Sequence, residues 1–185
     1  MREKIVKNIN ESWTFKKVSD QKWLKAQVPG CVHTDLLNND LIPDPFYGIN
    51  EINLQWISDE SWEYKTIVEL DDEFLNRKVQ LLKFYGLDTY AKVFVNGNLL
   101  IESNNMFCPW EVSVKDFFKM GKNEILVSFD SPIKKIIPKM SKMKYELPAD
   151  NDKIKKTSPH TRKAPYHYGW DWGPSFATCG IWQNV

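Results

Sequence analysis

One short segment combines residue types that suit a carbohydrate ligand. A single carboxylate, Asp171, lies between two indoles, Trp170 and Trp172, and glycines flank the three residues on both sides. Sugars present apolar C–H faces that pack on aromatic rings, and their paired hydroxyls donate to the two oxygens of a carboxylate. The sequence therefore predicts a sugar-binding site at Trp170, Asp171 and Trp172.

The conformation of this segment decides which side chains can share a pocket. In an extended backbone, Trp170 and Trp172 lie on one face and Asp171 points to the other. In a bent backbone, all three side chains can border one pocket. A structural alternative is equally compatible with the residues: both indoles pack in the core, and Asp171 caps a turn or pairs with Arg162 or Lys163.

Other patterns that could carry chemistry are weak. Cys31 and His33 are two residues apart, but no second pair follows at the short spacing of a zinc site, and His160, His167 and Cys179 are scattered. The glycines form no phosphate-binding loop. We expect no metal and no cofactor.

The acidic residues and the cysteines favour structural roles. Glycoside hydrolysis needs two carboxylates facing each other across a cleft, but the acidic residues fall mostly in turns, as at residues 71–73, or on outward strand faces. The sequence thus shows no catalytic pair. The three cysteines, Cys31, Cys108 and Cys179, are odd in number and widely spaced, which predicts free thiols.

Composition predicts one globular domain with no unusual partner. The chain has 185 residues, a net charge of +1 and eight tryptophans, so neither nucleic acid nor a membrane surface is indicated. It contains no long apolar segment. Residues 1–4 lack the apolar segment of a signal peptide, which predicts a cytoplasmic protein as the sequence stands, or a periplasmic or secreted one if a leader was removed.

Period-two alternation of apolar and polar residues predicts a β-rich fold. Expected strands cover residues 62–70, 79–84, 89–95, 99–102 and 124–130, with a tight turn at Asn96–Gly97. Ile67 interrupts the alternation, so the first of these strands is expected to be partly covered on both faces. A short helix is expected at residues 32–39, and another turn of helix at residues 114–119. This pattern predicts an antiparallel β-sandwich, with a jelly roll as first choice.

Two stretches depart from the strand pattern. Residues 132–163 carry ten Lys or Arg against three Asp or Glu; we interpret them as a long solvated loop, with a partner-facing arm as the alternative. Few aromatic residues accompany these charges, which argues against nucleic acid. Residues 181–185 resemble the beginning of a strand, which predicts a truncated chain.

The order of motifs resembles the N-terminal domain of β-mannosidases of glycoside hydrolase family 2. The similarity extends over nearly the whole chain. The motifs that carry it are Val28–Leu37, Leu41–Gly48, Gln55–Ile57, Trp62–Tyr64, Gly86–Ala91, Val95–Gly97, Asn104–Phe107, Arg162–Pro174 and Gly180–Trp182. The most specific parts are Pro-Gly-Cys-Val-His at residues 29–33 and Gly-Trp-Asp-Trp-Gly-Pro at residues 169–174.

The resemblance implies a fold, a function and roles for site residues. It implies an all-β, galactose-binding-domain-like jelly roll with short helices and one long loop. In the family, this domain leads into an immunoglobulin-like domain and a TIM barrel whose two glutamates hydrolyse terminal β-D-mannose with retention. The resemblance places Asp171 on hydroxyls of the terminal mannose and Trp170 and Trp172 around that sugar. Residues 1–185 then form one truncated accessory domain, inactive alone because the catalytic glutamates are absent.

Two other functions remain open at the level of the sequence. One is a free-standing carbohydrate-binding β-sandwich, and the other is a protein-interaction sandwich without a sugar ligand. A jelly roll can serve all three functions, so the fold does not separate them.

Overall fold

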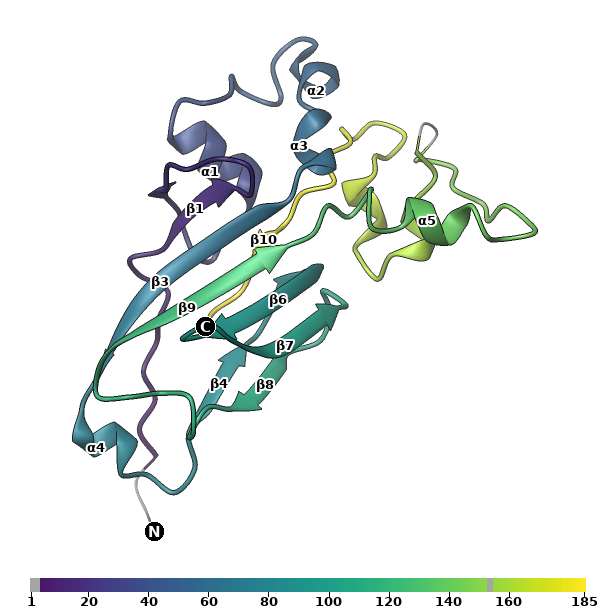
Figure 1. Cartoon of the computed structure of the whole chain (residues 1–185). Coiled ribbons are helices and arrows are strands. Elements are labelled where there is room, and N and C mark those ends of the chain that lie inside the picture. The colour runs from purple at the N-terminus through teal and green to yellow at the C-terminus, as the bar shows by residue number, and fades with distance from the viewer. Residues whose placement is uncertain (1–3, 153–154) are drawn as a thin grey trace.

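The computed structural model describes residues 4–152 and 155–185 and shows a β-sandwich from which one long loop projects (Figure 1). The larger sheet has six strands in the order β2-β1-β3-β9-β6-β7. These strands are β1 (Thr14–Lys17), β2 (Leu24–Lys25), β3 (Trp62–Leu70), β6 (Tyr90–Val95), β7 (Asn98–Asn104) and β9 (Gly121–Phe129). All their pairings are antiparallel.

Two short antiparallel pairs form the opposing layer. They are β4 (Leu81–Phe84) with β8 (Trp110–Ser113), and β5 (Leu87–Asp88) with β10 (Gly180–Ile181). The helices are short: α1 (Val32–Asn38), α2 (Asn50–Asn53), α3 (Trp56–Asp59), α4 (Asp72–Leu75), α5 (Ile137–Met140) and the 3₁₀ turns η1 (Ser158–His160) and η2 (Pro165–His167). The predicted all-β fold with few short helices is confirmed.

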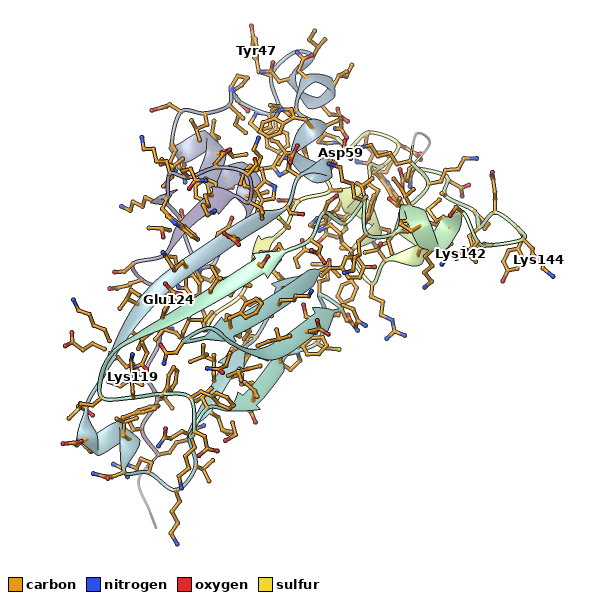
Figure 2. All side chains as sticks on the ribbon, viewed as in Figure 1. Tyr47, Asp59, Lys119, Glu124, Lys142 and Lys144 are labelled. Carbon is orange, nitrogen blue, oxygen red and sulfur yellow. The ribbon has the colours of Figure 1, made fainter. Side chains whose placement is uncertain are left out.

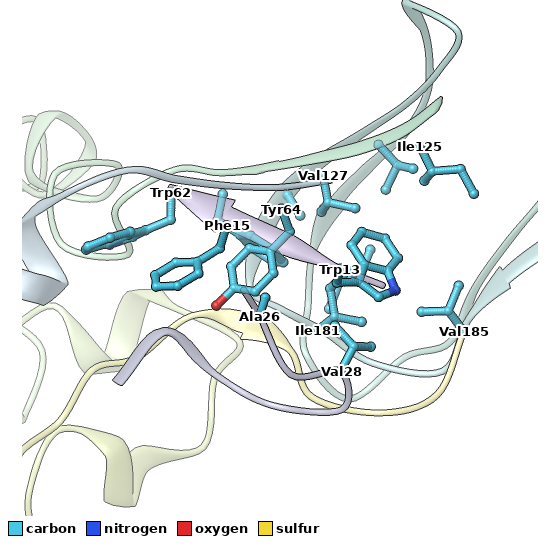
Figure 3. Close-up of a cluster of buried hydrophobic side chains, with 14 of the residues drawn as sticks. Trp13, Phe15, Ala26, Val28, Trp62, Tyr64, Ile125, Val127, Ile181 and Val185 are labelled. Atoms are coloured by element: carbon cyan, nitrogen blue, oxygen red, sulfur yellow. The ribbon is translucent and has the colours of Figure 1, made fainter. Parts of the chain in front are cut away.

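The core forms between the two layers because the inward faces of the long strands are apolar. One row of paired residues crosses five strands of the large sheet: Phe15, Tyr64, Val127, Val93 and Ile101. All five are buried. These residues belong to a larger buried apolar cluster, and Figure 3 shows part of it, including Ile181 of the opposing layer. Strand alternation therefore decides which residues enter the core.

The hairpin between β6 and β7 follows directly from its sequence. Asn96 and Gly97 both have positive φ angles, 48° and 83°, as expected for the two-residue turn that matches the twist of adjoining strands. Val95 pairs with Asn98 on either side of the turn. The tight turn predicted at this position is confirmed.

Local predictions had mixed outcomes. Ile67 is 49% exposed, so the outward face of β3 is partly covered there, as expected. Residues 114–119 form a single hydrogen-bonded turn, in which the Phe118 amide donates to the Val114 carbonyl at 3.0 Å. The strand expected at residues 79–84 begins only at Leu81, and residues 181–185 contribute only the end of β10. The helix predicted at residues 32–39 is confirmed as α1.

The projecting loop connects β9 to β10. It carries α5, η1 and η2, and Lys142 and Lys144 lie toward its outer end (Figure 2). Its return path passes close to α2 and α3 before re-entering the sandwich at β10. The segment with the two indoles and Asp171 lies on this return path.

Candidate functional site

The Trp-Asp-Trp segment is the tip of a small β-hairpin. Tyr168 and Ser175 form an antiparallel bridge, and the Trp170 amide donates to the Gly173 carbonyl over 3.1 Å in the same register. Asp171 and Trp172 therefore occupy the two-residue loop at the tip. Of the two conformations considered for this segment, the bent one is observed.

Gly169 is required on the outgoing side of this hairpin. Its φ angle is +109°, and a Cβ atom at this position would lie 3.3 Å from the Asn151 carbonyl oxygen. Such a φ angle is readily adopted only by glycine. The glycine before the first indole thus allows the chain to bend into the hairpin.

The tip residues face solvent. Trp172 is 85% exposed and Trp170 49% exposed, and their rings meet edge to face at 6.2 Å between centroids. Asp171 is also exposed, and its carboxylate forms no hydrogen bond or ion pair within the described part of the chain. Both structural alternatives, indoles in the core and Asp171 paired with Arg162 or Lys163, are therefore wrong.

A hollow of about 420 Å³ lies beside the hairpin. Trp170 forms part of its wall, whereas Asp171 and Trp172 do not line it. The other lining residues include the aromatic side chains Phe46, Tyr166 and Phe176, and Phe46 and Phe176 meet edge to face at 5.6 Å. The hairpin and the hollow together form a concave aromatic face with one free carboxylate at its edge.

A buried ion pair holds the base of the loop that carries the hairpin. The Lys163 ammonium, on the outgoing side, contacts the Asp88 carboxylate of β5, and both side chains are almost fully buried. The same ammonium donates to the Thr178 carbonyl on the returning side at 2.8 Å. Burial lowers the pKa of Lys163, and the adjacent Asp88 carboxylate opposes that shift. One cation thereby joins both ends of residues 163–178 to the sandwich.

Two histidines lie between this ion pair and the hollow. His33 Nδ1 lies 2.9 Å from the Thr178 hydroxyl. His167 Nδ1 is buried without a hydrogen bond, 3.9 Å from Asp88. Burial, reinforced by the positive charge of Lys163, lowers the pKa of both histidines from 6.5 to about 4. Both are therefore neutral at pH 7.

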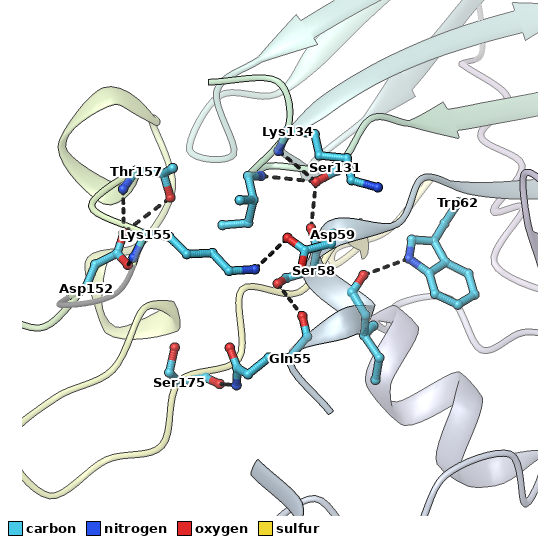
Figure 4. Close-up of polar contacts among 12 residues, drawn as sticks. Gln55, Ser58, Asp59, Trp62, Ser131, Lys134, Asp152, Lys155, Thr157 and Ser175 are labelled. Atoms are coloured by element: carbon cyan, nitrogen blue, oxygen red, sulfur yellow. Dashed lines mark hydrogen bonds and ion pairs between the residues drawn. The ribbon is translucent and has the colours of Figure 1, made fainter. Parts of the chain in front are cut away.

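The segment that contains α2 and α3 holds the returning side of the hairpin. Ser175 donates its amide to Glu51 Oε1 at 2.7 Å, and its carbonyl accepts from Gln55 Nε2 at 2.8 Å. Nearby, Lys155 of the projecting loop pairs with Asp59 of α3 at 2.5 Å. Figure 4 shows the Gln55 and Lys155 contacts side by side.

A metal site and a membrane span each have requirements against which the described residues can be compared. Within residues 4–152 and 155–185, no group of three or more His, Cys, Asp or Glu side chains is arranged to hold a metal ion. The three cysteine thiols are free. Among the same residues, no helix has the length and apolar character needed to cross a bilayer.

Comparison with known proteins identifies the family. The model of the glycosyl hydrolase 2 galactose-binding-like domain matches residues 13–183. The chain belongs to this family. Among solved structures, the β-D-mannosidase from Dictyoglomus thermophilum is similar with a TM-score of 0.91 and 43% identity, over 96% of this chain and 22% of that one.

Curated relatives that match this glycosyl hydrolase 2 domain are also named as β-mannosidases. β-Mannosidase B of Thermothelomyces thermophilus is 36% identical over 100% of this chain and 22% of its own length. The probable β-mannosidase of Caenorhabditis elegans is 34% identical over 96% and 21%. The chain thus spans about a fifth of the curated relatives that it matches. The β-D-glucuronidase from D. thermophilum, with 22% identity and a TM-score of 0.52, shares the fold.

The hairpin tip is evident from the sequence, but its supports are not. Asp88, Glu51 and Gln55 were not singled out, and Lys163 was considered only as a partner of Asp171; all but Glu51 lie within motifs that carry the family resemblance. Their partners across the fold lie 75 to 124 residues away along the chain. Lys163 also contacts Thr178, which is 15 residues away. Local patterns contain no signal for such contacts.

Proposed function

We propose that this chain is the accessory domain of a retaining exo-β-mannosidase that removes terminal β-D-mannose from oligosaccharides. Its part in that enzyme is to supply the hairpin tip to the substrate pocket. The relatives named as β-mannosidases support the substrate class. The observation that carries the proposal is the Asp171 carboxylate, which is exposed between two indoles and has no partner among the described residues.

Each tip residue has a role that its chemistry allows. Asp171 accepts hydrogen bonds from adjacent hydroxyls of the terminal mannose, because an ionised carboxylate is an acceptor with two oxygens. Trp170 provides an apolar wall, since it already lines the hollow beside the hairpin. Trp172, the most exposed of the three, closes the pocket from the other side of Asp171.

Hydrolysis itself belongs to parts of the enzyme outside this chain. Two carboxylates facing each other across a sugar site are required, and Asp171 is the single carboxylate of the hairpin tip. We propose that an immunoglobulin-like domain and a TIM barrel with two catalytic glutamates complete the protein. The 185-residue chain alone should then be inactive on a chromogenic β-mannoside. Turnover that survives purification and disappears on mutation within this chain would contradict this.

Substitution of Asp171 tests the central role. In the full gene product, Asp171→Ala should lower kcat/KM on a β-mannoside by one to two orders of magnitude, because charge-assisted hydrogen bonds contribute roughly 1.5–3 kcal/mol. Its Tm should change little, since exposed substitutions usually shift stability by about 0.5 kcal/mol or less. Asp116→Ala, at another exposed aspartate, is the matched control. A collapsed Tm with normal specific activity of the folded fraction would identify Asp171 as structural.

A further inference from the structure

The main-chain groups of Ser175 are both bound by side chains from a distant segment. Glu51 accepts from the Ser175 amide at 2.7 Å, and Gln55 donates to its carbonyl at 2.8 Å. The second proton of the Gln55 amide donates to the Glu51 carbonyl at 2.9 Å. The two side chains therefore act as one unit, here called the Ser175 clamp.

The clamp rests on a firmly packed support. Leu54, which precedes Gln55, and Ile57, two residues after it, are buried at 4% and 1% exposure in the main core. Ser58, one residue further, accepts at its carbonyl from the Ser131 hydroxyl at 2.7 Å (Figure 4). Because the segment that carries the clamp is packed in the core, the clamp fixes the position of Ser175 relative to the sandwich.

Ser175 in turn fixes the tip. It pairs with Tyr168, and the next pair in the same register, Trp170 with Gly173, encloses Asp171 and Trp172. Beyond Ser175, the hairpin has only the pair of Trp170 with Gly173, and its tip is exposed. A shift at Ser175 is therefore passed to Asp171.

We propose that Glu51 and Gln55 are positioning residues for substrate recognition, which hold Asp171 where it meets the sugar. This inference rests on the function proposed above. Neither residue touches the sugar; both act through Ser175 and the hairpin. A displacement of about 1 Å in a group that contacts the substrate can cost on the order of a hundredfold in rate, so loss of the clamp has a measurable effect on activity.

Three variants of the full gene product test the inference. Glu51→Ala and Gln55→Ala should each lower kcat/KM roughly tenfold, with a decrease in Tm of only a few degrees from the lost hydrogen bond. Glu51→Gln should stay within about threefold of wild type, because its amide oxygen still accepts from the Ser175 amide. Asn53→Ala is the matched control, since Asn53 is an exposed α2 residue whose side chain has no hydrogen bond within the described part of the chain. It should behave as wild type.

A double-mutant comparison separates positioning from general damage. If the clamp acts through Asp171, then Glu51→Ala in an Asp171→Ala background should lower kcat/KM by less than about twofold. Hydrogen exchange of residues 165–178 should also accelerate in Glu51→Ala and not in Asn53→Ala. An equal loss with and without Asp171, or no loss at all, overturns the inference. If Asp171→Ala itself leaves kcat/KM unchanged, the proposed function fails and the positioning role with it.

Discussion

The buried Lys163 ammonium holds both ends of residues 163–178. Its ammonium satisfies the Asp88 carboxylate and the Thr178 carbonyl at once, and its side chain has no exposed surface. Burying two charges is costly, so such a pair adds less stability than its short contact suggests. Its value lies in joining the outgoing and returning ends of residues 163–178 to β5.

Removal of that ammonium should strongly destabilise the chain. Lys163→Met leaves Asp88 buried without its cation, and breaking a buried pair in this way typically costs about 3–5 kcal/mol. In Lys163→Met/Asp88→Asn no charge remains, so part of that loss should be recovered. Urea unfolding of the wild type, the single variant and the double variant measures the difference. A double variant no more stable than the single one would show that the ion pair is not the source of the loss.

The sequence predicts a residue's exposure more readily than its partner. Asp171 lies between two indoles in a segment bounded by glycines, as expected of a loop, and it is exposed. The partner of Lys163 was beyond sequence reasoning, because Asp88 lies 75 residues earlier on another strand. Asp171, eight residues away in sequence, is a carboxylate that local spacing equally allows as a partner. Only the folded topology brings Asp88 and Lys163 together.

At the level of elements, prediction worked where a strand is long and buried on one face. β3, β6 and β9 alternate clearly and were located from that alternation. β8 was missed, since its four residues are half-buried or exposed in turn and carry no strong apolar face. The helices α2 and α3 have four residues each, too few for helical periodicity. These two unpredicted helices support the clamp on Ser175.

Gly180 in β10 is packed too tightly for any side chain. A Cβ atom there would lie 2.7 Å from the Gly30 carbonyl oxygen and 2.8 Å from Cys31 Cα. Gly180→Ala should therefore destabilise the chain by roughly 3 kcal/mol, from backbone strain and overpacking together. Gly48, like Gly180, has a positive φ angle, but a Cβ atom at Gly48 would lie within 4 Å of no other atom. Gly48→Ala should therefore lower stability by only about 1 kcal/mol. Equal losses in thermal unfolding would refute the steric argument.

At the level of the whole molecule, several basic residues of the projecting loop pair with carboxylates. Lys135 pairs with Asp130 at the start of the loop and Lys156 with Glu146 within it, whereas Lys155 and Lys163 pair with Asp59 and Asp88 of the sandwich. These contacts fit the interpretation of residues 132–163 as a solvated loop, anchored at several points. The hairpin thus extends from a sandwich that holds it at its base and at Ser175.

Three buried titratable groups link the stability of the molecule to pH. Burial lowers the pKa of His33 and His167 from 6.5 to about 4. Their contribution to stability is complete above pH 6.5 and is lost as the pH falls toward 4. Asp35 acts in the opposite sense: burial raises its pKa from 3.8 to about 6, against hydrogen bonds from Tyr64 and Gln27. Its contribution is complete below pH 3.8 and is lost as the pH rises through 6.

The two histidines and Asp35 change stability with pH in opposite directions, and their pKa shifts are similar in size. Because there are two histidines, they should determine the sign of the pH dependence. The free energy of unfolding should fall by about 3 kcal/mol between pH 6.5 and pH 4.5. His33→Gln and His167→Gln should each flatten this dependence, since each removes a group that binds protons only after unfolding. Asp35→Asn should steepen it, because the opposing group is lost. Urea unfolding at several pH values measures these slopes. A flatter profile for Asp35→Asn would show that Asp35 is ionised in the folded chain across this range and that the assigned sign is wrong.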